Sequence, residues 1–101
     1  MNIEERIRAS VLDQDHLADL LRGNEASAHA IMVRVIELLR DGRIELYTYA
    51  SGGGVEVLDF NVALEIAANP KCWSWRSEHD EEQLYFLSPV YLENGSLAYG
   101  S

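Results

Sequence analysis

Residues 28–49, AHAIMVRVIELLRDGRIELYTY, contain the change of pattern that decides the fold. In the first part, apolar residues recur every three or four positions, which predicts an amphipathic helix ending at Asp41-Gly42. The expected inward residues of this helix are Ala28, Ile31, Met32, Val35, Ile36 and Leu39, with Val33 and Leu38 widening the apolar face. From residue 43 to residue 49 the period becomes two, which predicts a strand. A central helix that runs directly into a strand indicates an α+β protein.

The segment before this helix predicts one or two further helices. An apolar residue at every fourth position indicates a helix over residues 2–12. A glutamine interrupts the stripe at position 14, and Asp13 or Asp15 can cap a second, short helix through Arg22. The alternative of one continuous helix over residues 2–22 stays open.

The segment after the first strand begins with a loop rich in glycine. A short strand is expected over Val55–Leu58, followed by a helix over Phe60–Ala68 that Asp59 caps and Asn69-Pro70 ends. The glycines precede a strand and not a helix, so the loop is interpreted as a hairpin turn and not as a phosphate-binding loop. The sheet therefore has a helix inserted between its strands.

Two more strands are expected near the end of the chain. Residues 72–76 and 83–87 predict a hairpin joined by an acidic turn. The whole chain, residues 1–101, is expected to form one domain with residues 1–89 as its core. Residues 90–101 are interpreted as a tail that Tyr91, Leu92 and Tyr99 order in part. The order of the strands is left open.

The charge balance limits the partners. Of 101 residues, 17 are acidic and 8 basic, and the formal net charge is −9. Nucleic-acid binders need Lys and Arg to replace phosphate counterions, and an acidic chain is repelled by nucleic acid and by anionic membranes. We therefore expect neither as a partner, and we expect a basic protein surface instead. A monomer and a homodimer are both left open.

Other features of composition indicate the compartment. No run approaches the roughly 20 apolar residues that a membrane helix needs. The N-terminus carries acids where a signal peptide would carry basic residues. The single cysteine, Cys72, excludes an internal disulfide and a multi-cysteine zinc site. A cytoplasmic protein without metal or cofactor is the expectation.

Residues 31–49, with VIELLRDGRIEL at 35–46, resemble the recognition helix that runs into the wing of the winged helix-turn-helix superfamily. Residues 59–70, followed by 84–89 (LYFLSP), resemble small bacterial proteins of unknown function that elaborate the wing. The resemblance covers residues 3–89. It implies a winged-helix-like fold, with N-terminal helices before a small antiparallel sheet, and it allows a DNA-binding transcriptional regulator.

The residues at the start of the candidate recognition helix depart from that DNA-reading pattern. Winged helices that read DNA place Arg, Lys, Asn, Gln or Ser there, whereas residues 24–33 carry no basic side chain before Arg34. The wing offers only Arg43 as a cation. Protein binding is therefore the leading hypothesis, and a DNA-binding regulator is the alternative.

Few residues suggest chemistry. His16 lies among aspartates and His29 shares a helix face with Glu25, but two groups do not make a zinc site, and both histidines are interpreted as paired with carboxylates. No catalytic unit is evident, so we expect no enzyme, and a small enzyme that uses either histidine is a third hypothesis. Trp73 and Trp75 share one strand face, which is either core or interface.

The leading hypothesis is an inhibitor or immunity-type protein that occludes a basic partner surface. Acidic side chains would meet the partner's charges, and aromatic rings would supply apolar anchors. The expected partner-binding residues are Tyr47, Tyr49, Asp59, Trp75, Glu78, Asp80, Glu81 and Glu82.

Overall fold

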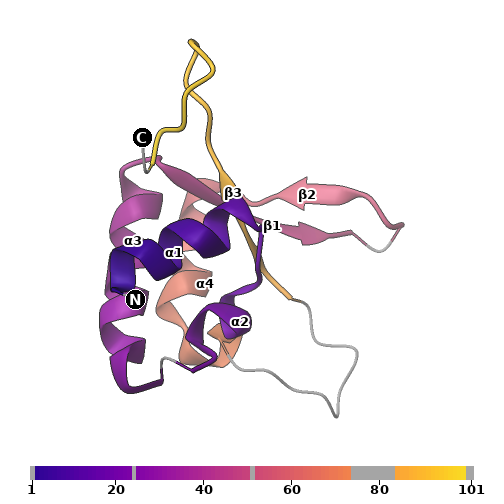
Figure 1. The fold of residues 1–101 in the computed structure, drawn as a ribbon. Coiled ribbons are helices and arrows are strands. Elements are labelled where there is room, and N and C mark those ends of the chain that lie inside the picture. Colours follow the sequence, from indigo (N-terminus) through magenta and orange to yellow (C-terminus); the bar gives the residue numbers. More distant parts are fainter. Residues whose placement is uncertain (1, 24, 51, 74–83, 100–101) are drawn as a thin grey trace.

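The computed structural model describes residues 2–23, 25–50, 52–73 and 84–99. It shows an α+β protein in which N-terminal helices precede a small antiparallel sheet with a helix inserted between its strands, which confirms the predicted fold class (Figure 1). The helices are α1 (Ile3–Leu12), α2 (Leu17–Leu21), α3 (Ala28–Arg40) and α4 (Phe60–Ala68), with short 3₁₀ turns η1 (Glu25–Ser27) and η2 (Pro70–Trp73). The strands are β1 (Ile44–Tyr49), β2 (Val55–Val57) and β3 (Phe86–Pro89).

The first strand, β1, is the centre of the sheet. The order is β2-β1-β3, and both neighbours pair with β1 antiparallel. On one face of β1, Ile44, Leu46 and Thr48 are buried as the alternation predicts, and Leu46 lies opposite the fully buried Leu87 of β3. The Thr48 hydroxyl donates a 2.8 Å hydrogen bond to the backbone oxygen of Leu84, which satisfies this polar group inside the core.

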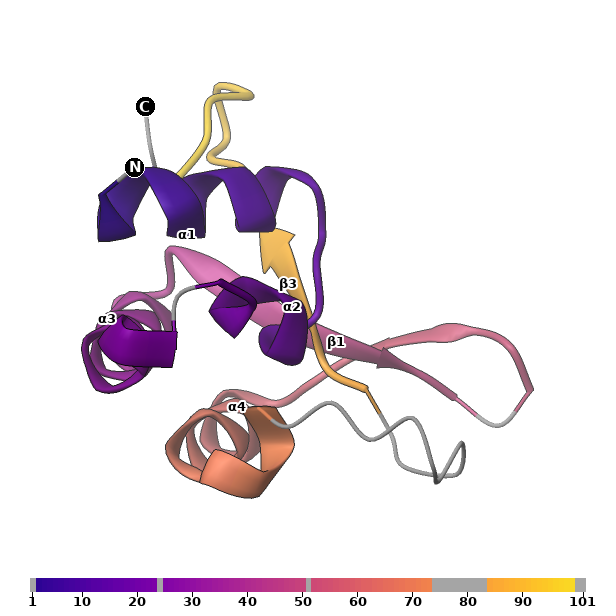
Figure 2. The same cartoon turned by 60° about the horizontal axis from the view of Figure 1, so that its bottom comes forward.

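The helices surround the inner part of the sheet. In Figure 2, α3 and α4 lie side by side along one side of the molecule and α1 along the other, with α2 and the strands between them. The stripe of α3 is buried at Ile31, Val35 and Leu39 as predicted, and Leu38 is fully buried. Val33 was expected to widen this face but is 43% exposed, because it lies off the stripe that contacts α4 and β1. Within the described residues, no helix has the length and apolar character needed to cross a bilayer.

The N-terminal segment forms two helices, which settles the alternative left open. Asn2 caps α1, since its side-chain oxygen accepts a 2.8 Å hydrogen bond from the backbone N–H of Glu5. The cap of α2 is His16 and neither Asp13 nor Asp15, so that prediction is wrong. The reason is tertiary: the chain turns after α1 and residue 16 forms an isolated bridge with Phe86, which moves the start of α2 to residue 17.

The predicted hairpin of residues 72–76 and 83–87 is wrong where the structure describes it. Cys72 and Trp73 lie in η2, not in a strand, while residues 74–83 fall outside the described residues. Trp73 is buried, and its indole N–H donates a 3.0 Å hydrogen bond to the Ala67 backbone oxygen. This contact folds the chain back on α4, so β3 pairs with β1 instead. Trp73 is thus a core residue, whereas Trp75 lies outside the described part.

Pro89 is the last residue of β3 and lies opposite Ile44, so the strand extends two residues beyond the predicted end at residue 87. Proline is tolerated at strand ends and on outer strands because its missing N–H removes no ladder bond there. Beyond it, the tail turns on itself through an isolated bridge between Tyr91 and Leu97. Of the three residues expected to order the tail, Tyr99 is buried, whereas Tyr91 and Leu92 are exposed.

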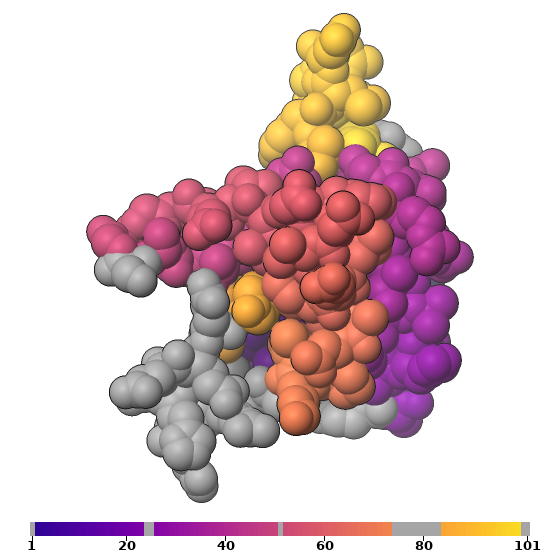
Figure 3. Space-filling model, turned by 180° about the vertical axis from the view of Figure 1, so that it is seen from behind, coloured from indigo at the N-terminus to yellow at the C-terminus, as the bar shows by residue number. Residues whose placement is uncertain are grey.

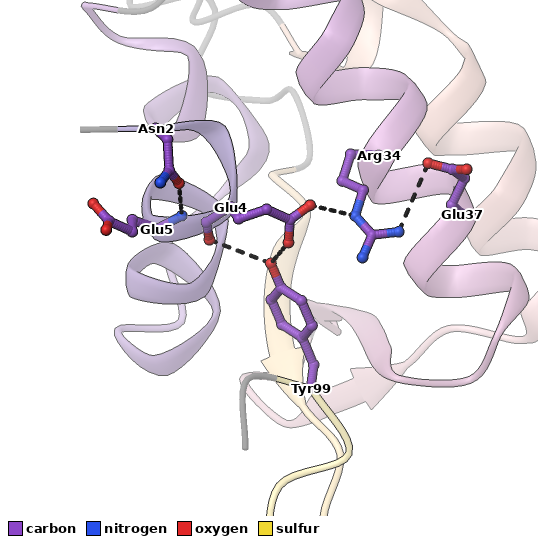
Figure 4. Close-up of polar contacts among 6 residues, drawn as sticks. All are labelled: Asn2, Glu4, Glu5, Arg34, Glu37 and Tyr99. Carbon is purple, nitrogen blue, oxygen red and sulfur yellow. Dashed lines mark hydrogen bonds and ion pairs between the residues drawn. The ribbon is translucent and has the colours of Figure 1, made fainter.

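A polar network joins this tail to the N-terminal helices (Figure 4). The Tyr99 hydroxyl donates a 2.6 Å hydrogen bond to one oxygen of Glu4, and the Arg34 guanidinium donates a 2.5 Å bond to the other. Arg34 also contacts Glu37 at 3.7 Å. The hydrogen bond from Tyr99, followed by Arg34, holds the pKa of Glu4 below its ordinary value. Burial, followed by the bond to Glu4, raises the pKa of Tyr99 to about 12.

Replacing Tyr99 with Phe is expected to lower the free energy of unfolding near pH 7 by about 1 kcal/mol, because one hydrogen bond to a half-exposed carboxylate is lost. The pKa of Glu4 is lowered on folding, so its contribution is present above the ordinary carboxyl pKa of 4.5 and is lost as the pH falls through the folded value. Urea denaturation at about pH 7 and about pH 3 measures this difference. The exposed Tyr91→Phe is the control, and an equal loss at both pH values would contradict the assignment.

Candidate functional site

The β1–β2 hairpin projects away from the helices, beside α4 (Figures 1 and 3). All three residues of β2 are exposed, and Val55 and Val57 keep 60% and 55% of their surface in contact with solvent. Large apolar residues continue along the adjoining start of α4, where Phe60 and Val62 are also exposed. Contiguous apolar exposure of this kind is typical of a binding surface, while single exposed residues are ordinary.

Four rings cluster on the face of the sheet that carries the valines. Tyr47 stacks on Phe86 with centroids 5.3 Å apart, and Tyr49 stands nearly perpendicular to both rings. The His16 ring stands edge-on to Phe86, with the two ring centroids 5.8 Å apart. Tyr47 is buried, and burial raises the pKa of its phenol, whereas Tyr49 is 52% exposed. Tyr47 therefore supports the cluster, and Tyr49 presents its ring to solvent.

A small pocket lies where the end of α3, β1 and the start of α4 meet. Its volume is about 140 Å³. The lining residues are Leu39, Gly42, Ile44, Glu45, Leu46, Leu58, Phe60 and Ala63. The walls are apolar, and Glu45 is the only ionisable group among them. Ligand sites for cofactors usually measure about 300–1,000 Å³. This pocket suits a single inserted side chain, such as an apolar one or a Lys or Arg whose stem packs on the walls.

The acidic residues of this part of the chain are all on the surface. Residues 41–70 carry five acids against the single base Arg43, a charge of −4. The exposed acids are Asp41, Glu45, Glu56, Asp59 and Glu65. The ion pairs seen among the described residues involve Arg22 and Arg34 with acids of α1, α2 and α3, and none involves these five. This surface therefore combines apolar side chains with carboxylates that no described cation neutralises.

The structure describes three of the eight expected partner-binding residues, and these three differ in exposure. Tyr49 and Asp59 lie on the exposed surface, and Asp59 precedes α4 as predicted, although its side chain makes no capping hydrogen bond. Tyr47 lies in the same cluster but is buried, so it is not an exposed anchor. The remaining five, Trp75, Glu78, Asp80, Glu81 and Glu82, lie outside the described residues.

The exposure of Val55, Val57 and Phe60 was not predicted from the sequence. A short alternating strand and an amphipathic helix normally indicate inward-facing apolar side chains, so local pattern alone places these residues in the core. The position of β2 at the edge of the sheet, beyond the helices, leaves the two valines exposed, and Phe60 is exposed at the first turn of α4. The run of three glycines before the strand was the one signal of a projecting hairpin.

The histidines have structural positions. The Nδ1 atom of His16 accepts a 3.1 Å hydrogen bond from the backbone N–H of Asp19, which caps α2. Burial lowers the pKa of His16, more than the neighbouring Asp19 and Asp15 raise it. His29 is exposed on α3. Among residues whose placement is described, no group of three or more His, Cys, Asp and Glu side chains could hold a metal ion.

Replacing His16 with Ala is expected to lower the free energy of unfolding by about 1 kcal/mol near pH 8, since the cap of α2 is lost. The pKa of His16 is lowered on folding, so its contribution is present above its ordinary pKa of 6.5 and is lost as the pH falls through the folded value. His16→Asn keeps a capping oxygen and should lose less stability, with a flatter pH dependence. Chemical denaturation across this range tests it; His29→Asn is the control. A pH dependence unchanged in both His16 variants would refute the role.

The chain matches no protein-family model, no curated protein and no solved structure. Its function must therefore be inferred from its own residues. The surface formed by β2, the exposed end of β1 and the start of α4 is the strongest candidate, and we call it the hairpin surface. It consists of Tyr49, Val55, Glu56, Val57, Asp59 and Phe60.

Proposed function

We propose that this chain is a non-enzymatic protein-binding module that covers a basic surface of a partner protein. The observation that carries the proposal is the composition of the hairpin surface, where exposed apolar side chains occur together with carboxylates that no described cation neutralises. Glu56 lies on the sheet face opposite that of Val55 and Val57. Apolar and aromatic residues supply the affinity of most interfaces, and charges around them supply speed and selectivity. Both are present here within one projecting element.

The geometry suits occlusion. The hairpin extends away from the helices, so it can reach into a concave basic site while the start of α4 lies at the rim of that site (Figure 1). Tyr49 and Phe60 would pack on the partner, and Asp59 would meet a basic side chain at the rim. The pocket beside Glu45 would accept one apolar or basic side chain from the partner. An inhibitor or immunity-type protein works by such coverage and needs no chemistry of its own.

The alternative, a winged-helix regulator of DNA, has less support. A recognition helix needs cations that are available to phosphates. On α3, Arg34 is held by Glu4 and Glu37, and Arg40 is at the C-terminal end of the helix. The protein-binding proposal requires no cation and uses the surface that the fold leaves exposed.

Charge reversal tests the proposal. The double variant Glu56→Lys, Asp59→Lys is expected to weaken binding of the partner by at least about tenfold, because two favourable charge contacts become repulsive. Its matched control is Asp13→Lys, Glu93→Lys, which changes the net charge equally at exposed positions away from the hairpin surface. The three immobilised proteins are exposed to native-host lysate at moderate salt, and each captured protein is quantified by mass spectrometry.

A basic protein retained by the wild type and by the control but not by the hairpin variant is the expected result. Calorimetry with that purified protein then gives the fold-change in affinity. Equal loss in both double variants would show that only overall charge matters, and nucleic acid recovered in place of a protein would favour the regulator. Either result would overturn the proposal.

A further inference from the structure

The two outer edges of the sheet differ. The edge of β3 is occupied by the segment between α1 and α2: the Leu17 N–H donates to the Tyr85 oxygen at 3.0 Å, and the Leu87 N–H donates to the Asp15 oxygen at 2.9 Å. The bridge between His16 and Phe86 belongs to the same pairing. No described segment of the chain pairs with the outer edge of β2. Among the described residues, the sheet therefore has one protected edge and one open edge.

The register shows which groups of β2 face outward. The Ala50 N–H donates to the Gly54 oxygen at 2.7 Å, and the Leu58 N–H donates to the Leu46 oxygen at 2.9 Å. In an antiparallel ladder, hydrogen-bonded pairs alternate with pairs whose backbone groups point away from the partner strand. Because Val55 and Val57 lie opposite β1 residues at the alternate positions, their N–H and C=O groups point to the open edge. The N–H and C=O groups of Val55 and Val57 are thus two donors and two acceptors that an added strand could pair with.

Natural proteins usually protect such an edge with lysine, proline, a bulge or a covering loop. β2 is a short strand, Val-Glu-Val, with one charged residue, but it has no lysine or proline and no described segment covers its edge. Its two valines are both more than half exposed. An open edge with β-branched side chains is a template for strand addition, in which main-chain hydrogen bonds supply affinity and alternate side chains supply specificity.

Charge decides which strand fits. A second copy of this chain paired antiparallel about Glu56 would place Glu56 opposite its own equivalent, and like charges directly opposite are destabilising. Each copy also has a net charge of −9. A Lys or Arg opposite Glu56 would instead form a favourable cross-strand pair. Apolar residues on either side would continue the row that Val55 and Tyr49 already form across the strands.

We propose that the open edge of β2 adds an extended segment of the partner as a fourth strand, and that this segment alternates apolar and basic residues. The inference rests on the proposed function and states its mode of binding. Val55 and Val57 contribute both the backbone hydrogen bonds and the apolar contacts, and Glu56 selects the basic residue between them. The surface is thus specific for a basic strand, and not for a basic surface of any shape.

The probe is a short capped peptide in which Val and Lys alternate, used at concentrations where the peptide alone is monomeric. Its affinity is measured by fluorescence anisotropy, and the backbone amide shifts of Val55 and Val57 are followed by NMR. Matched peptides carry Glu in place of Lys, or N-methyl groups on alternate amides, with the protein unchanged. Loss of several edge hydrogen bonds should weaken binding of the N-methylated peptide at least about tenfold.

The protein variant is Val57→Pro, which removes an outward-pointing N–H and leaves the ladder with β1 intact. It should weaken binding of the Val-Lys peptide by about tenfold, whereas the control Val57→Ile, which keeps the N–H, should stay within about twofold. In the wild type, the Val-Lys peptide should shift the Val55 and Val57 amides, and the Val-Glu peptide should bind far more weakly.

Four results would overturn the proposal. Equal binding of the N-methylated peptide, or no binding of the Val-Lys peptide, would exclude strand addition. Equal binding of the Val-Glu peptide would remove the role of Glu56. Wild-type dimers in sedimentation that Val57→Pro dissociates would make a second copy the occupant. If strand addition is excluded but a basic protein is still captured through Glu56 and Asp59, the proposed function stands. Failure of the strand-addition proposal is therefore distinguishable from failure of the proposed function.

Discussion

The rest of the structure depends on the burial of β1. This strand pairs on both sides, and its residues Ile44, Leu46 and Thr48 lie in the core. β3 pairs with Ile44–Tyr47 and β2 with Tyr47–Tyr49, so β1 is the strand that joins the sheet and the base on which helices pack. Because β2 follows β1 directly and β3 arrives from the far end of the chain, the two outer strands end in different surroundings. One is enclosed and the other projects.

Because the two outer strands differ in this way, the contacts that stabilise the fold and the surface proposed for recognition lie in different parts of the molecule. The polar network of Glu4, Arg34 and Tyr99 joins the N-terminal helix, α3 and the tail on the side where the two termini lie (Figures 1 and 4). The hairpin tip lies on the opposite side. Changes at Val55 or Glu56 therefore touch few contacts that hold the core together. A projecting, lightly packed element can bind a partner without a large cost in folding stability.

The aromatic cluster links these two regions. Tyr47 and Phe86 stack across β1 and β3, and His16 touches Phe86 while it caps α2. The exposed Tyr49 stands on this base. A ring held by neighbouring rings loses less conformational entropy when a partner binds it, which makes Tyr49 a pre-ordered contact. The same rings fix the loop between α1 and α2 against β3, and this loop is what closes that edge of the sheet.

The sequence by itself determined the elements whose signals are local. The periodic stripe and the Asp41-Gly42 stop predicted α3, alternation predicted β1, and flanking polar residues and Pro70 predicted α4, all close to their observed bounds. Helix and strand periods, caps and breakers act over a few residues, so they can be recognised in the sequence without knowledge of the fold. The acidic charge of the hairpin and the candidates Tyr49 and Asp59 were legible in the same way.

Only the tertiary structure decided which strands pair and which side chains are exposed. β3 pairs with β1 and not with the segment at Trp73, because the buried indole turns that segment back on α4. His16 caps α2 because β3 holds the preceding loop, and Tyr47 is buried while Val55 is exposed because β1 is central and β2 is outermost. Each of these outcomes depends on contacts between residues far apart in the chain, and a local pattern carries no information about them.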